Sequence, residues 1–354
     1  MSAPNANSLA RIRAINYRVP RPVIFGCAGP ELSEKERTFF NATQPLGFIL
    51  FARNCVDPAQ VRALVASLRA AVERRDAPVL IDQEGGRVQR LGPPHWPSRP
   101  SAGRIAELSR RDRTAGRRAA RLAGRLIAQD LKALGINVNC APVLDVLRPE
   151  THGVIGDRAF GDDPRAVAAL GRAFAMGLQQ GGVLPIVKHV PGHGRARADS
   201  HLELPVVEAG LEELEATDFV PFRLLSDLPW AMTAHVLYRA LDAENPATTS
   251  PKIITDVIRG HMRFGGVLLS DDLSMQALKG SLADRARAAL AAGCDVVLHC
   301  NGKMDEMVEI AAAAPNATPV SSRRVARTLA TRPPRNSIAV AAASAELDSL
   351  LAGI

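Results

Sequence analysis

The sequence predicts a single-domain (β/α)8 barrel of the TIM type with additional helices at its carboxyl end. Eight short apolar runs, rich in β-branched residues, alternate with longer amphipathic runs through most of the 354 residues. Polar side chains stand at the ends of five of these apolar runs. No linker, internal repeat or low-complexity stretch divides the chain. We therefore expect a tail over residues 1–20 and one barrel domain, C-terminal helices included, over residues 21–354.

The predicted strands are the short runs rich in valine, isoleucine and leucine. They cover Val23–Cys27, Gly47–Phe51, Val79–Asp82, Val138–Val143, Leu184–Lys188, Ala231–His235, Gly266–Ser270 and Asp295–His299. The clearest helix begins at Asp57-Pro58, because aspartate caps a first turn and proline suits the first helical position. One face of this helix then carries apolar residues at helical spacing, namely Val61, Leu64, Val65, Leu68 and Val72. From Asn316 onward the pattern predicts two helices that pack on the outside of the barrel.

The polar residues at the strand ends favour a barrel over an open, doubly wound sheet, which would show the same alternation. These residues are Asp82, His189, His235, Asp271 and His299. In a barrel the carboxyl ends of all strands converge on one mouth, where active sites lie. In an open sheet they would be spread along an edge, with ligands confined to a switch point. Convergence of five polar side chains is typical of a barrel enzyme.

Composition excludes several other classes of protein. The chain is 47% hydrophobic, so it can bury a large core, and its net charge of +8 comes mostly from arginines scattered along helix-like segments. Aromatic residues are only 4%, which favours a solvated basic surface over a nucleic-acid groove. No run of about 18 apolar residues and no secretory signal is present, so we expect no membrane partner.

The five cysteines indicate a reducing compartment. Their number is odd, most lie in apolar runs, and neither a Cys-x-x-Cys pair nor a zinc spacing occurs. We expect a cytoplasmic monomer that needs no metal or other cofactor. A transit peptide within the first 21 residues, which contain arginine and lack acidic residues, is the alternative to an unstructured tail.

The densest group of chemically active residues is Ile186-Val-Lys-His-Val-Pro-Gly-His-Gly194, followed by Asp199-Ser200-His201. The proline and glycines end the strand, so His193 falls in a loop and is expected to hold that loop by hydrogen bonds. Asp199 and His201 form a candidate acid–base dyad, because a carboxylate beside an imidazole orients the ring and stabilises its protonated form. An exposed polar loop is the alternative. The segment from Gly192 to His201 has few apolar anchors, so we expect it to be mobile.

Asp271 follows the apolar run Gly266–Ser270 and should point into the mouth as a nucleophile, a base or a metal ligand. Its alternative role is to cap a helix after Ser274. Asp272 should point the other way, since side chains alternate along a strand, and is expected to be structural.

A second cluster, Asp82-Gln-Glu-Gly-Gly-Arg-Val-Gln-Arg90, combines carboxylates, glycines and arginines after a strand. This composition suits a hydroxyl-rich or anionic ligand, and the glycine spacing is not that of a dinucleotide loop. Arg158, in the loop Gly156–Gly161, is a further candidate, although a lone arginine in a loop is more often part of a surface ion pair.

Together these stretches resemble glycoside hydrolase family 3, and within it the bacterial β-N-acetylglucosaminidases of the NagZ type, which act in cell-wall recycling. The resemblance also includes Ala141-Pro-Val-Leu-Asp145, Ile155-Gly-Asp-Arg-Ala-Phe-Gly161 and Ser270-Asp-Asp-Leu-Ser-Met275, in family order from Gly47 to about Met275. Lys-His-x-Pro-Gly-His-Gly with Asp-Ser-His is highly specific. The loop Leu-Gly-Pro-Pro-His-Trp-Pro after Arg90 is where this chain departs in detail.

The resemblance implies a role for each candidate residue. Asp271 would be the nucleophile, His201 the acid/base and Asp199 its partner. The sugar would be bound by Asp82, Arg90, Arg158, Lys188 and His189. The implied substrate is a carbohydrate, N-acetylglucosamine at the end of an anhydro-muropeptide.

Five alternatives stay open. A β-glycoside phosphorylase or a β-glucosidase of the same family would use a similar site. A Schiff-base aldolase would use Lys188 as its nucleophile. A metal hydrolase would bind zinc through His189, His193 and Asp271, although the His-x-x-x-His pair lies in a Pro-Gly loop and not on a helix as in the zincin motif. A sugar-binding protein without activity would need neither nucleophile nor proton donor.

Overall fold

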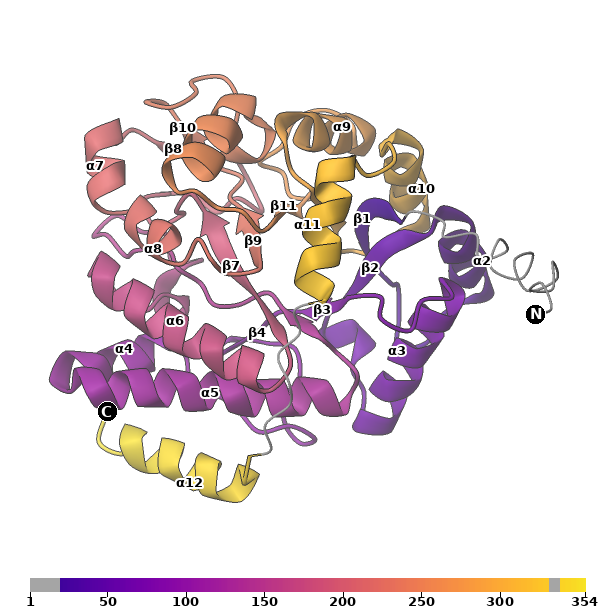
Figure 1. Cartoon of the computed structure of the whole chain (residues 1–354). Coiled ribbons are helices and arrows are strands. Elements are labelled where there is room, and N and C mark those ends of the chain that lie inside the picture. Colours follow the sequence, from indigo (N-terminus) through magenta and orange to yellow (C-terminus); the bar gives the residue numbers. More distant parts are fainter. Residues whose placement is uncertain (1–19, 331–337) are drawn as a thin grey trace, which may run out of the picture.

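The computed structural model describes residues 20–330 and 338–354, and its centre is a closed barrel of eight parallel strands (Figure 1). The predicted fold class and all eight predicted strands are confirmed. In barrel order the strands are β1 (Arg21–Gly26), β12 (Val296–His299), β11 (Val267–Asp272), β9 (Trp230–Thr233), β7 (Leu184–Val190), β6 (Val138–Asn139), β3 (Val79–Ile81) and β2 (Pro45–Leu50). The predicted tail, residues 1–20, lies outside the described residues except for Pro20.

Helices surround the barrel and follow most of its strands. They are α2 (Glu34–Thr43), α3 (Pro58–Ala71), α4 (Ala102–Arg111), α5 (Arg113–Ala133), α6 (Pro164–Gln180), α7 (Leu211–Ala216), α8 (Phe219–Leu224), α9 (Leu282–Ala292) and α10 (Met304–Ala313). Short helical turns are η1 (Ala52–Asn54), η2 (Gly156–Arg158) and η3 (Ala247–Thr249), and Ile253–His261 forms a π-helix, η4. Two small sheets at the loops pair β4 (Gln83–Gly85) with β5 (Val88–Gln89) and β8 (Val206–Val207) with β10 (Leu237–Tyr238).

The start of α3 has the two features that predicted a helix there, an aspartate cap and a proline in the first turn. The side chain of Asp57 accepts hydrogen bonds from the backbone N–H groups of Ala59 and Gln60, and Pro58 occupies the first helical position. Four of the five apolar residues named for this helix are buried along it, and Val72 lies buried just after its last residue.

Side chains alternate between the inside of the barrel and the layer under the helices, and this alternation selects which polar residues face the mouth. Val267 and Leu269 of β11 belong to the cluster of buried apolar side chains that fills the inside of the barrel, here called the inner cluster. Asp271 lies two residues further along the same strand and therefore continues the inner face. By the same spacing Lys188 follows inner residues of β7, and Asp82 follows an inner residue of β3.

His299 lies on the opposite face, so its expected convergence on the mouth is wrong. It follows Leu298, an inner residue of β12, and its buried ring points outward to the helix layer. There its Nε2 lies 2.8 Å from a carboxylate oxygen of Glu306 on α10.

The last two helices pack on two different parts of the barrel. α12 (Val340–Leu351) packs on the outside beside α5, as predicted (Figure 1). α11 (Pro319–Ala330) instead covers the amino-terminal end of the barrel, where Val325 and Leu329 pack against the inner cluster. The indole N–H of Trp230, the first residue of β9, donates to Thr328 Oγ1 at 3.0 Å.

Within the two described ranges, 20–330 and 338–354, no helix combines the length and apolarity needed to cross a membrane.

Asp295, just before β12, ties α11 to the barrel, and its removal should destabilise the fold. Its buried carboxylate accepts hydrogen bonds from Arg259 (2.7 Å), Arg324 (2.9 Å) and the hydroxyl of Ser321 (2.8 Å). Asp295→Ala would leave two arginines without their anion, so we expect a loss of about 3 kcal/mol in the free energy of unfolding. Urea denaturation would measure it, with Asp348→Ala, an exposed position on α12, as the matched control. An equal, small effect of both substitutions would contradict this account.

Candidate active site

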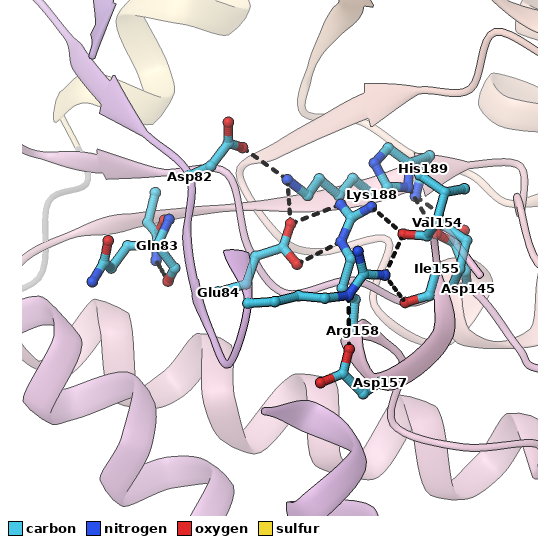
Figure 2. A network of polar contacts seen from close by, with 12 residues as sticks. Asp82, Gln83, Glu84, Asp145, Val154, Ile155, Asp157, Arg158, Lys188 and His189 are labelled. Carbon is cyan, nitrogen blue, oxygen red and sulfur yellow. Dashed lines mark hydrogen bonds and ion pairs between the residues drawn. The ribbon is translucent and has the colours of Figure 1, made fainter. Parts of the chain in front are cut away.

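Lys188 is the central charged group of the mouth. It is 3% exposed, and its Nζ lies 2.9 Å from Asp82 Oδ1 and 2.7 Å from Glu84 Oε1 (Figure 2). Burial by itself would lower the pKa of Lys188, but the two carboxylates outweigh it and hold the pKa above its usual value. The amine therefore stays protonated. A Schiff-base lysine needs the opposite shift, so this geometry argues against the aldolase.

Arg158 also contacts the carboxylate of Glu84. Its Nε and Nη2 each lie 2.8 Å from an oxygen of Glu84, which is a bidentate pair. Glu84 is buried and the side chain of Arg158 is only 11% exposed, so the surface ion pair considered for Arg158 is wrong. Burial would raise the pKa of Glu84, but Lys188 and Arg158 hold it below its usual value. Sequence reasoning assigned no role to Glu84, although its position two residues after Asp82 placed both acids on one face.

Arg90 directly follows β5, the second strand of the β4–β5 pair, and its side chain contacts Asp82. Its Nη2 lies 3.2 Å from Asp82 Oδ2, and its guanidinium lies 5.1 Å from the ring centre of Phe51. The buried side chain of Gln83 points away from Lys188 in Figure 2 and accepts the backbone N–H of Arg90 at 2.8 Å. Burial opposes ionisation of Asp82, but Lys188 and Arg90 hold its pKa well below the usual range.

Asp145, for which no separate role was predicted, holds two histidines in place. Its Oδ2 accepts from His189 Nδ1 at 2.7 Å, and its Oδ1 accepts the backbone N–H of His193 at 2.7 Å. Burial alone would raise the pKa of Asp145, but the neighbouring histidines, His189 foremost, lower it to about 2. Because Asp145 fixes the proton on Nδ1, the Nε2 of His189 is the ring atom that can bind a ligand.

Lys188 and His189 are consecutive, yet both contribute to the mouth. The register between β7 and β9 shifts between Lys188 and Val190, so one extra residue is inserted at His189. Such a bulge turns the strand and re-aims a side chain.

Asp271 lies at the end of β11, partly exposed, and its carboxylate accepts the backbone N–H of Asp272 at 2.8 Å. Burial works against ionisation, but His189 and His235 hold the pKa of Asp271 below its usual value. The residues after Ser274 form turns, and the next helix is capped by Ser281, so Asp271 is not a helix cap.

Asp272 holds the turn that follows, in agreement with the structural role expected for it. Its Oδ1 accepts the backbone N–H groups of Ser274 (3.1 Å) and Cys300 (3.2 Å). The carbonyl of Asp272 accepts from Nε2 of His235 at 3.0 Å. Burial lowers the pKa of His235, whose Nδ1 contacts Thr248 Oγ1 at 2.7 Å. His235 thus braces the end of β11 beside the candidate nucleophile.

The candidate dyad is formed. His201 Nδ1 lies 2.7 Å from Asp199 Oδ1, and the backbone N–H of His201 donates to the same oxygen at 2.9 Å. The His201 side chain is 61% exposed and that of Asp199 is 23% exposed. The carbonyl groups of Ser200 and His201 accept the N–H groups of Ala277 (3.2 Å) and Gln276 (3.3 Å). The dyad therefore lies against the segment that follows Asp271 in the chain.

The loop that carries the dyad is anchored in its first half, Gly192–Ala196, by polar contacts and not by the apolar side chains considered in the sequence. The Tyr238 hydroxyl donates to the carbonyl of Gly192 at 2.7 Å, and Arg195 Nε donates to Asp218 at 2.7 Å. A Cβ at Gly194 would lie 1.9 Å from the carbonyl oxygen of Val146, so the backbone there needs glycine. The exposed part begins at Arg197.

No metal centre is evident among the residues that the structure describes. None of their His, Cys, Asp and Glu side chains form a group of three or more that could hold an ion, and His189, His193 and Asp271 are not such a group. The five cysteines are free thiols, and four of them are buried, in agreement with the sequence analysis.

Comparisons with known proteins agree with this geometry. The family model described as "Glycosyl hydrolase family 3 N terminal domain" matches residues 12–330. A β-hexosaminidase of Alkalilimnicola ehrlichii is 42% identical over 310 residues, covering 86% of this chain and 88% of that protein. One of Methylococcus capsulatus is 43% identical over 309 residues, covering 86% and 90%.

Solved structures give the same result. The structure of NagZ from Neisseria gonorrhoeae in complex with N-trifluoroacetyl-D-glucosamine superposes with a TM-score of 0.85 at 34% identity, covering 94% of this chain and 99% of that one. The chain therefore belongs to glycosyl hydrolase family 3, as a glycoside hydrolase that groups with the β-hexosaminidases of that family.

Proposed function

We propose that this protein is a retaining exo-β-N-acetylglucosaminidase that works through a covalent glycosyl-enzyme. The observation that carries the proposal is an ionised Asp271 on the inner face of the barrel, with the Asp199–His201 dyad docked on the segment that follows it. The β-hexosaminidase relatives and the amino-sugar complex of the gonococcal enzyme support N-acetylglucosamine as the sugar released.

The first chemical step uses one carboxylate and one imidazole. Retaining glycosidases usually employ two carboxylates, one as nucleophile and one as acid/base. Here Asp271 attacks the anomeric carbon while His201, protonated, donates from Nε2 to the leaving oxygen. Asp199 holds the proton on Nδ1 and stabilises the imidazolium.

The second step reverses the proton transfer. His201, now neutral, takes a proton from water, and the hydroxide attacks the anomeric carbon and displaces Asp271. Two inversions leave the sugar with its β configuration.

The charged groups around Lys188 bind the sugar hydroxyls in this proposal. Lys188, Arg158, Asp82, Arg90 and His189 are each held by a partner at hydrogen-bond distance. Groups fixed in this way lose little freedom when the sugar binds, and their hydrogen bonds can strengthen as positive charge develops on the ring.

The biological substrate we propose is a peptidoglycan fragment, an anhydro-muropeptide with a terminal N-acetylglucosamine, hydrolysed in the cytoplasm. Five free thiols support a reducing compartment.

Turnover of an aryl N-acetyl-β-D-glucosaminide is the direct test of the proposed activity. We expect release of N-acetylglucosamine whose β anomer appears first, observed by proton NMR, because two displacements occur at the same carbon. The rate should be unchanged by EDTA. Formation of a sugar 1-phosphate in phosphate buffer would identify a phosphorylase instead, and binding of N-acetylglucosamine without turnover would identify a sugar-binding protein.

Asp271→Asn should abolish turnover while sugar binding persists. The substitution keeps the shape of the side chain but removes the attacking charge, so we expect kcat/KM to fall by about 10⁴-fold or more. Mass spectrometry after a 5-fluoro glycosyl trap should identify an adduct on Asp271. Labelling of Asp272 would overturn the assignment.

His201→Ala should impair cleavage most for poor leaving groups, since activated nitrophenolates depart with little protonation. Azide should restore part of the second step and give a β-glycosyl azide. His261→Ala, in η4 away from the mouth, is the matched histidine control. An equal loss on all substrates, without azide rescue, would leave His201 with a structural role.

A further inference from the structure

The turn that carries the dyad has one buried side chain, that of Ser200. Ser200 is 4% exposed, although the side chains on either side of it, Asp199 and His201, are 23% and 61% exposed. Its Oγ lies 3.2 Å from Nε2 of His193, at the anchored end of the same loop. A hydrogen bond between side chains therefore joins the fixed half of the loop to the exposed half.

His193 is placed so that it can act only as a hydrogen-bond partner. It is 3% exposed, and its Nδ1 is buried with no hydrogen-bond partner among the described residues. A buried N–H without a partner costs about 1–3 kcal/mol, so the proton belongs on Nε2, which donates to Ser200 Oγ. Burial lowers the pKa of His193 to about 4, which agrees with a neutral ring.

The same histidine is tied to the sugar-binding side of the mouth. Asp145 accepts the backbone N–H of His193 with one oxygen and Nδ1 of His189 with the other. The contacts form a continuous series from His189 through Asp145 and His193 to Ser200, and from there to the dyad.

We propose that His193 and Ser200 are positioning residues for the acid/base. Their hydrogen bond holds the Asp199–His201 turn against Gln276 and Ala277, so that His201 is presented to the leaving oxygen. This inference rests on the proposed glycosidase function and adds to it the element that sets the position of the proton donor.

Ser200→Ala should reduce protonation of the leaving group without reducing sugar binding. The readout is kcat/KM for phenyl and for 4-nitrophenyl N-acetyl-β-D-glucosaminide, which need protonation to different extents. We expect a loss of about fivefold on the phenyl glycoside, the factor that corresponds to one neutral hydrogen bond, and less than about twofold on the nitrophenyl glycoside. Equal losses on both substrates would overturn the proposal.

Two further variants separate this hydrogen bond from general loosening of the loop. Ser200→Thr keeps the hydroxyl and should retain both rates within about twofold. Tyr238→Phe removes the hydrogen bond to Gly192 in the anchored half and should not change the ratio between the two substrates. A change of that ratio in Tyr238→Phe, or no rescue by threonine, would count against a specific role for Ser200.

A double-mutant cycle tests whether Ser200 acts through His201. Once His201 is replaced by alanine, removing the Ser200 hydroxyl should cause no further loss on the phenyl glycoside. Additive losses would show that the two residues act independently and would overturn the proposal.

Hydrogen exchange gives a readout that does not depend on activity. In Ser200→Ala the amides of His201, Gln276 and Ala277 should exchange faster, whereas those of Leu184–Val190 should not change. Unchanged exchange at the three amides would overturn the inference even in an active enzyme. Absence of turnover by the unmodified protein would refute the proposed function but would leave this structural test in force.

Discussion

The mouth of the barrel depends on the ion pairs of Lys188 with Asp82 and Glu84. An isolated charge in such a buried position costs several kcal/mol, and it persists only where opposite charges and hydrogen bonds compensate it. The amine meets both carboxylates, and Arg158 and Arg90 satisfy the remaining oxygens. Because these groups neutralise one another, each stays ionised and fixed in place. The result is a rigid set of donors and acceptors before any sugar arrives.

The need to compensate buried charge also explains why Asp271 differs from Asp82 and Glu84. The carboxylates of Asp82 and Glu84 contact cations directly, whereas the hydrogen bond of Asp271 comes from a backbone N–H. Its charge is supported at longer range by His189 and His235. A carboxylate that is ionised but not clamped by a cation keeps its nucleophilic oxygen available.

Sequence reasoning reached the fold and most of the candidate site because both depend on local patterns. Strand runs and polar strand ends are local features, so the barrel and the positions of Lys188 and Asp271 could be predicted. The side of the strand on which His299 lies could not be predicted. Barrel strands are apolar on both sides, and the sequence does not say which side is inside. The pairs Glu84–Arg158 and Asp145–His193 join residues far apart in the chain, and only the folded structure brings them together.

The histidines of the site divide into buried rings and one exposed ring, that of the proposed acid/base His201, and the division follows from solvation. Burial lowers the pKa of His193 to about 4 and also lowers that of His235, and both rings serve as hydrogen-bond partners. A histidine that must gain and lose a proton in every cycle needs access to water and a carboxylate at one nitrogen. His201 meets both conditions because its turn projects from the loop, while Asp199 fixes its Nδ1. An exposed turn, however, does not hold its own position. In our proposal the buried hydroxyl of Ser200 and the ring of His193 hold this turn in place, so that solvent exposure of the proposed acid/base and a defined geometry coexist.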